Sequence, residues 1–120
     1  MKTKGRTDPN KETLIRNLKG IAAENNAKIW SALASELSRP NRQRVTVNIS
    51  HLNRVSNPGD ILLIPGKVLG AGILDHKLKI AAESFSISAK TKIQNAGGQC
   101  LTIEELITSN PKGSQVRLIK

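Results

Sequence analysis

Residues 61–72 read ILLIPGKVLGAG, and this stretch constrains the fold more than any other part of the chain. Its first four residues are all apolar and have the length of a buried β-strand. Pro65 and Gly66 are typical of a turn, so we predict that the strand ends there. Gly70 and Gly72 predict a tight corner, in which the glycines adopt positive φ angles or let another backbone approach closely.

The glycines around Lys67 are also suggestive of a nucleotide-binding loop, but their spacing argues against one. A P-loop needs a glycine, four residues and then Gly-Lys-Ser/Thr, whereas Val68 follows the lysine and no glycine stands five residues before Gly66. The dinucleotide pattern Gly-x-Gly-x-x-Gly also fails, because Asp75 stands at its third glycine. An enzyme that holds a nucleotide between Gly66 and Gly72 is therefore only an alternative.

The segments on both sides of this strand predict a mixed α/β fold. Residues 8–38 contain two apolar stripes at helical spacing, separated at Asn25-Asn26, and Asp8-Pro9 is a typical helix start. After residue 44, short strand-like and helix-like segments alternate. The predicted caps of the later helices are Ser50, Ser86 or Ser88, and Thr102 with Glu105 as a capping box. We predict a mixed α/β fold in a single domain, with N-terminal helices followed by alternating short strands and helices.

The length of 120 residues fits one domain with one hydrophobic core rather than two. Only Trp30 and Phe85 are aromatic, and both stand in apolar stretches that predict core positions. We predict a flexible basic tail over residues 1–7 and one domain over residues 8–120. The predicted parts of that domain are a helical part at 8–38, a basic segment at 39–59 and an α/β part at 60–120.

The charge of the chain favours a polyanionic partner. Nineteen lysines and arginines stand against nine acidic residues, a formal net charge of +10. This net charge exceeds the magnitude of about 2–8 expected of a small domain. It favours nucleic acid as the binding partner over an anionic membrane or an acidic protein. No stretch approaches the roughly 18 consecutive apolar residues of a membrane span, so we expect no membrane partner.

The basic charge is densest between Ser38 and Gly59, where four arginines stand without an acidic residue. Arginine donates two parallel hydrogen bonds to a phosphate group, and residues 39–44 are predicted to form a loop that presents arginines to folded RNA. Base stacking is disfavoured because both aromatic side chains are predicted to be buried. The predicted RNA-binding residues are Lys2, Lys4, Arg6, Arg39, Arg42, Arg44, Arg54, Lys67, Lys77, Lys90 and Lys92.

The sequence contains no recognisable catalytic or metal-binding pattern. His51 and His76 stand apart, with a single cysteine, which does not match a zinc site. Cys100 stands in an apolar segment with no basic neighbour to lower its pKa, which predicts a buried structural thiol. We predict no catalytic residue, no metal, no cofactor and no small-molecule substrate.

Three stretches of the chain together resemble one known family. They are RPNRQRVTVNISHLNR from Arg39, GKVLGAGILDHKLKIAAESFSISAKTKIQNAGGQCLTIEEL from Gly66, and NPKGSQVRL from Asn110. In this order and spacing they resemble the archaeal and eukaryotic large-subunit ribosomal protein eighteen-e. That family is similar in fold to bacterial large-subunit ribosomal protein fifteen. The densest match runs from Ala89 to Leu106 and includes the Ala-Gly-Gly at 96–98.

The resemblance implies a structural component of the large ribosomal subunit. It also implies an α/β fold of N-terminal helices followed by irregular strand-strand-helix turns. It implies binding to large-subunit ribosomal RNA in the cytoplasm, contacts with neighbouring ribosomal proteins, no enzyme activity and no cofactor. We expect the isolated chain to be a monomer. An RNA- or DNA-binding protein outside the ribosome is the alternative.

Overall fold

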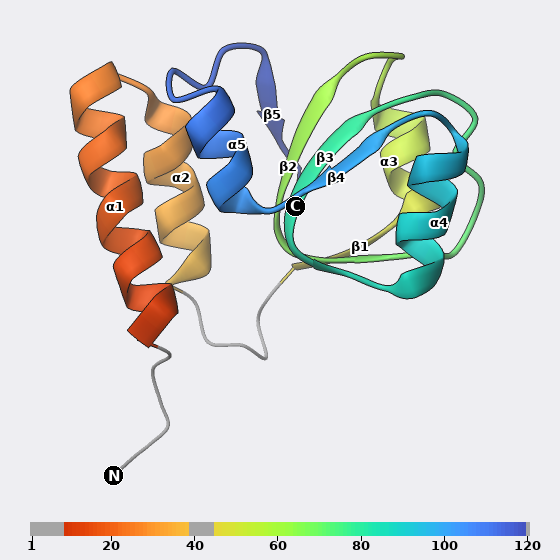
Figure 1. The fold of residues 1–120 in the computed structure, drawn as a ribbon, viewed down its shortest axis with the longest axis horizontal. Coiled ribbons are helices and arrows are strands. Elements are labelled where there is room, and N and C mark those ends of the chain that lie inside the picture. Colours follow the sequence, from red (N-terminus) through yellow and green to blue (C-terminus); the bar gives the residue numbers. More distant parts are fainter. Residues whose placement is uncertain (1–8, 39–44, 120) are drawn as a thin grey trace, which may run out of the picture.

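The computed structural model describes residues 9–38 and 45–119. Figure 1 shows two N-terminal helices beside a sheet that carries further helices, which confirms the predicted α/β class. The elements are α1 (Pro9–Asn25), α2 (Lys28–Leu37), β1 (Val45–Asn48), α3 (Ile49–Val55), β2 (Ile61–Leu69), β3 (Lys79–Phe85), α4 (Ile87–Asn95), β4 (Gln99–Leu101), α5 (Ile103–Ser109) and β5 (Val116–Leu118). None of the helices in the described ranges is long and apolar enough to cross a membrane.

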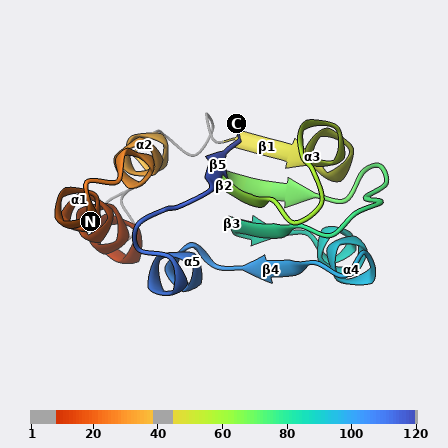
Figure 2. The ribbon, with the colours of Figure 1, turned by 90° about the horizontal axis from the view of Figure 1, so that it is seen from above.

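The strands of the described chain form one sheet whose pairings are parallel. The order is β1-β2-β3-β4, and β5 also pairs with β2. Adjacent parallel strands need crossover connections, and α3 connects β1 to β2 while α4 connects β3 to β4. In Figure 2, α1, α2 and α5 lie on one side of the sheet, and α3 and α4 lie on the other.

Strand β2 continues through Pro65 and Gly66, so the predicted end of the strand at these residues is wrong. Residues 61–63 pair with β5, whereas residues 66–69 pair with β1 along the same strand. The register toward β3 shifts between Ile64 and Lys67, which is a bulge. Proline lacks an N–H group and is tolerated at such an irregularity, where one neighbouring strand replaces another.

The sheet divides the apolar interior into two layers, rather than the single core that the length predicted. Leu62 and Ile64 belong to the layer with α3 and α4, whereas Leu63 belongs to the layer with α1, α2 and α5. Successive residues of a strand point to opposite faces. The apolar run at 61–64 therefore reflects a strand with both faces covered, as buried parallel sheets require.

The two aromatic residues differ in burial. Trp30 is fully buried in the layer of α1, α2 and α5, as predicted. Its indole Nε1 donates to the carbonyl oxygen of Pro111 at 2.7 Å, which satisfies the one polar group of the ring. Phe85 is only half-buried at the margin of the other layer.

Most helix ends follow the predicted local signals. The break between α1 and α2 lies at Asn26, whose φ is 52°. Ser86 caps α4 by accepting a backbone N–H, and Thr102 and Glu105 form the predicted capping box of α5. Gly97 follows the end of α4 with a φ of 85°, a conformation that favours glycine.

Helix α3 begins directly after β1, so the prediction that Ser50 caps it is wrong. The N-cap position is Asn48, and its side chain accepts the N–H of Ala71 at 3.4 Å instead of capping the helix. The backbone N–H of Ser50 donates to the carbonyl oxygen of Ala71 at 3.0 Å. Both residues therefore hold the loop that follows β2.

Candidate nucleic-acid interface

The predicted RNA-binding residues fall into two groups. Six lie outside the described residues, namely Lys2, Lys4, Arg6, Arg39, Arg42 and Arg44. The other five are spread over the surface: Lys67 is in β2, Arg54 in the last turn of α3, Lys77 just before β3, and Lys90 and Lys92 on α4. The structure therefore does not gather these five into one compact site.

Lys67 stands in a row of exposed polar side chains that crosses three strands. Its register partners are Thr46 in β1 and Ser84 in β3, and all three are exposed. Val68, the next residue of β2, is fully buried in the layer of α3 and α4. Because side chains alternate along a strand, Lys67 lies on the opposite face of the sheet, as an open cation on a polar surface.

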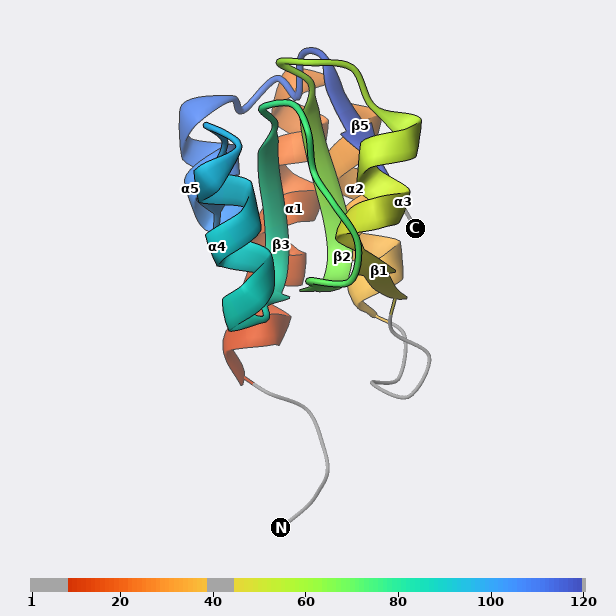
Figure 3. The same ribbon diagram turned by 90° about the vertical axis from the view of Figure 1, so that its right-hand side faces the viewer.

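The connection from β2 to β3 explains the glycine corner. Adjacent parallel strands are usually joined by a helix, but residues 70–78 contain none. Figure 3 shows this loop returning between α3 and α4. Leu74 and Leu78 bury their side chains in the layer below it. Without a helix, the polar groups of the loop backbone need partners from the flanking helices.

Lys92 provides two of these hydrogen bonds. Its Nζ donates to the carbonyl oxygens of Gly70 and Gly72 at 2.5 and 2.6 Å. From the opposite helix, Asn53 Oδ1 accepts the backbone N–H of Asp75 at 3.1 Å. An ammonium group has three donors, so Lys92 retains little capacity for phosphate while it holds the loop. Lys92, which the sequence predicts as an RNA contact, therefore also has a structural role in the loop.

We expect Lys92→Met to lower the free energy of unfolding by about 1 kcal/mol, because two charge-assisted hydrogen bonds at a partly exposed site are lost. The backbone amides of Ala71 and Asp75 should exchange with solvent faster. Denaturant unfolding and hydrogen exchange measure the two effects. Lys90→Met, two residues away on the same helix, is the control and should change neither; equal effects of both variants would contradict the role of Lys92.

The glycines of the corner allow other parts of the chain to pack closely. A Cβ atom at Gly70 would overlap the side chain of Ser88, and one at Gly72 would overlap Ser50. A Cβ atom at Gly66 would overlap the carbonyl group of Val45. The close approach predicted from these glycines is thus made by the protein itself. The space that a nucleotide would need beside them is filled.

Ser56, His76 and Asp75 form a chain of contacts that the sequence analysis did not predict. Ser56 Oγ lies 2.9 Å from His76 Nε2, and His76 Nδ1 lies 2.8 Å from Asp75 Oδ1. The order matches that of a Ser-His-Asp triad. However, Ser56 Oγ donates to the carbonyl oxygen of Leu52 at 2.6 Å, and the Asp75 side chain is 70% exposed. The contacts therefore fasten the loop to the end of α3. The hydrogen bond from His76 lowers the pKa of the Asp75 carboxyl group.

Cys100 is half-buried on β4. Burial raises the pKa of its thiol, in agreement with a structural role, while the positive charge of Lys90 opposes that rise. The prediction that no basic residue acts to lower the pKa of Cys100 is therefore wrong, because the charge of Lys90 on α4 has this effect. The larger effect is burial, and the thiol is not activated.

Lys79 is an exposed cation that the sequence analysis did not select. It stands two residues after Lys77, and both line one hollow at the end of the sheet. Leu78 between them is buried. The alternation Lys-Leu-Lys at the start of a strand is the signal that could have identified Lys79, because it directs both lysines away from the core.

Comparison with known proteins identifies the family. A family model described as ribosomal proteins 50S-L15, 50S-L18e and 60S-L27A matches residues 24–101. The chain is 48% identical over 119 residues to large ribosomal subunit protein eL18 of Methanoregula boonei, covering 99% of this chain and 98% of that protein. It is 50% identical over 113 residues to eL18 of Methanococcus maripaludis, covering 94% of each. It is 44% identical over 115 residues to eL18 of Methanothermobacter thermautotrophicus, covering 96% and 95%. The chain belongs to the family of ribosomal proteins 50S-L15, 50S-L18e and 60S-L27A.

Proposed function

We propose that this chain is a structural constituent of the large ribosomal subunit and binds folded ribosomal RNA in the cytoplasmic ribosome. The observation that carries the proposal is the similarity over almost the whole chain to proteins named large ribosomal subunit protein eL18. The net charge of +10 supports it, because ribosomal RNA is a polyanion.

The mode of binding that fits these residues is electrostatic contact with the phosphate backbone. Trp30 is fully buried, with its Nε1 bonded within the chain, so its ring is not a stacking platform. The described cations lie on several surfaces, which suits an RNA fold that surrounds the protein on more than one side. Phosphate contacts of this kind position a protein without reading sequence.

We assign the largest share of binding to Arg39, Arg42 and Arg44, with the basic tail over residues 1–7 as a further contact. These arginines stand between α2 and β1, and no acidic residue follows until Asp60. Guanidinium groups bind phosphate through two parallel hydrogen bonds and remain charged at every physiological pH.

Replacing Arg39, Arg42 and Arg44 together with alanine is expected to weaken binding to large-subunit ribosomal RNA by about 100-fold near 0.15 M salt, since three phosphate contacts are lost. The measurement is a filter-binding or fluorescence titration. The matched control replaces the three exposed lysines Lys19, Lys28 and Lys112 with alanine and removes the same charge. Equal losses in both variants would argue against the arginine segment as the main contact.

We propose neither an enzyme activity nor a cofactor for this chain. Its other partners would be neighbouring ribosomal proteins, and the isolated chain would be a monomer. The serine in the one triad-like arrangement that we find in residues 45–119 donates its hydroxyl hydrogen to Leu52. The glycine corner is filled by side chains of α3 and α4. Both features are therefore accounted for by the packing of the loop between β2 and β3.

A further inference from the structure

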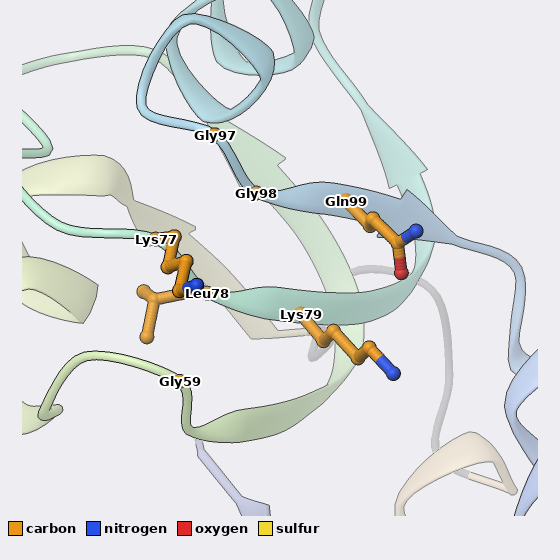
Figure 4. A pocket seen from close by; sticks show the side chains of 7 residues that line it. All are labelled: Gly59, Lys77, Leu78, Lys79, Gly97, Gly98 and Gln99. Atoms are coloured by element: carbon orange, nitrogen blue, oxygen red, sulfur yellow. The ribbon is translucent and has the colours of Figure 1, made fainter.

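A hollow of about 250 Å³ opens at the end of the sheet where β2, β3 and β4 begin (Figure 4). Its lining combines backbone from three glycines with the side chains of Lys77, Lys79 and Gln99. The volume lies below the roughly 300–1,000 Å³ of pockets that enclose a small-molecule ligand. A site of this size on an open surface suits one unit of a longer chain.

The backbone around the hollow is held rigidly by internal hydrogen bonds. Gly59 N donates to Lys77 O at 2.8 Å, and Lys79 N donates to Asp60 O at 3.0 Å. On the other side, Gln99 N donates to Leu78 O at 2.9 Å. These bonds connect the starts of the three strands, so a ligand would meet a preformed surface and little ordering would oppose binding. They also occupy these N–H groups, so hydrogen bonds to a ligand must come from side chains.

The hollow exists because glycines line it. Gly59 and Gly97 both have a φ of 85°, which other residues rarely adopt, and a Cβ atom would meet only open space at Gly59. Gly98 is required for another reason, because a Cβ atom at this position would overlap the carbonyl oxygen of Leu78. The Ala-Gly-Gly at 96–98 thus ends α4, brings β4 against β3 and leaves a concave surface.

The hollow is positively charged. Lys77 and Lys79 are exposed, and neither has an ion-pair partner within residues 9–38 and 45–119. Asp60, the carboxylate at the start of β2, is already paired with Arg117 at 3.1 Å. In Figure 4 the side chains of Lys79 and Gln99 extend to the same side of the strands. Two ammonium groups and an amide are donors suited to an anion with several oxygens.

Lys79 and Gln99 also line a second groove, which carries Glu104 and Glu105 on α5. These carboxylates would repel a phosphate chain, so a polyanion that enters the hollow must leave it on the side of Lys77 and Gly97. The charges therefore indicate the path of the bound chain as well as the class of ligand.

We propose that this hollow binds a segment of the sugar–phosphate backbone of ribosomal RNA, with Lys77 and Lys79 donating to phosphate oxygens and Gln99 to a neighbouring ribose or phosphate oxygen. The inference rests on the proposed function and adds a defined subsite to it. The proposal adds Lys79 and Gln99 to the RNA-contacting residues. It also places Lys77 at the rigid end of the sheet, where it contacts phosphate together with these two residues and not as an isolated surface charge.

The test compares full-length chains in binding to full-length large-subunit ribosomal RNA from about 50 to 200 mM salt. Each phosphate contact contributes roughly 0.7–0.9 to the slope of log affinity against log salt. The Lys77→Ala/Lys79→Ala variant should therefore have a slope shallower by about 1.4–1.8, so that the wild type loses about tenfold more affinity over this range. The matched control, Lys19→Ala/Lys28→Ala, should keep the salt dependence of the wild type. The Lys77→Arg/Lys79→Arg variant should also keep it, because both positive charges remain.

A second measurement on the wild-type chain is the acetylation of lysines, read by mass spectrometry with and without RNA. Lys77 and Lys79 should be protected in the complex. An unchanged slope in the Lys77→Ala/Lys79→Ala variant, or equal acetylation of the two lysines with and without RNA, would overturn the subsite while leaving the proposed function intact. A wild-type chain whose affinity does not depend on salt would instead overturn the proposed function.

Discussion

Gly66→Ala is expected to lower the free energy of unfolding by about 3–5 kcal/mol, a large part of the roughly 5–15 kcal/mol that stabilises a typical domain. The added Cβ atom would overlap the carbonyl oxygen and carbon of Val45, the register partner of Gly66 in β1. A clash with backbone cannot be relieved by a change of rotamer. β1 must therefore move away from β2, which also displaces α3, because the helix follows β1 without a loop.

The matched control for this variant is Gly20→Ala in α1. Gly20 is exposed, and a Cβ atom there would meet nothing within 4 Å. Alanine is favoured over glycine inside a helix, so this variant should be more stable by about 0.5–1 kcal/mol. Denaturant unfolding of both variants measures the opposite signs. Similar small changes in the two proteins would contradict the close approach of β1 to Gly66.

The affinity of the chain for large-subunit ribosomal RNA is expected to fall about 10³–10⁵-fold between about 50 and 200 mM salt, if it makes roughly 6–10 phosphate contacts. Each contact releases condensed counterions, and added salt opposes that release. The net charge of +10 and the scarcity of exposed aromatic groups leave phosphate contacts as the main source of binding. A titration at four or five salt concentrations gives the slope. A duplex DNA competitor separates recognition of folded RNA from general attraction to polyanions.

The parts of the fold that depend on local chemistry could be predicted from the sequence. Thr102 and Glu105 form their capping box, and Ser86 caps α4, because such caps need only residues three positions apart. The break at Asn26 and the glycine at the end of α4 follow from backbone preferences that hold in any context.

The course of β2 could not be predicted from local preferences. Pro65-Gly66 is typical of a turn, yet the strand continues, because β5 and β1 pair with its two halves and a bulge absorbs the irregularity. The prediction of a single core was wrong for a related reason. The apolar run at 61–64 indicates burial, but only the tertiary structure shows that helices cover both faces.

For the candidate site, the sequence indicates which residues are basic but not how they are arranged. A count of charges finds the basic residues, but it cannot separate Lys92, whose ammonium holds the loop at Gly70 and Gly72, from Lys67, which is open on the sheet surface. Lys79 joins Lys77 in one hollow only because β4 lies against β3. The hydrogen bonds of Lys92 to Gly70 and Gly72 and the pairing of β4 with β3 connect residues that are far apart in the chain, so composition and spacing carry no signal for them. The exposure of Lys79 does have a local signal, which is the Lys-Leu-Lys alternation at 77–79.

The most direct test of the ribosomal assignment is co-sedimentation of the purified chain with large ribosomal subunits from which it has been removed. We expect the chain to sediment with the subunits at moderate salt, at about one copy per subunit, and to be released at high salt. The replacement of Arg39, Arg42 and Arg44 by alanine should shift release to lower salt. A chain that stays in the supernatant at moderate salt, or that sediments equally with small subunits, would contradict the central claim.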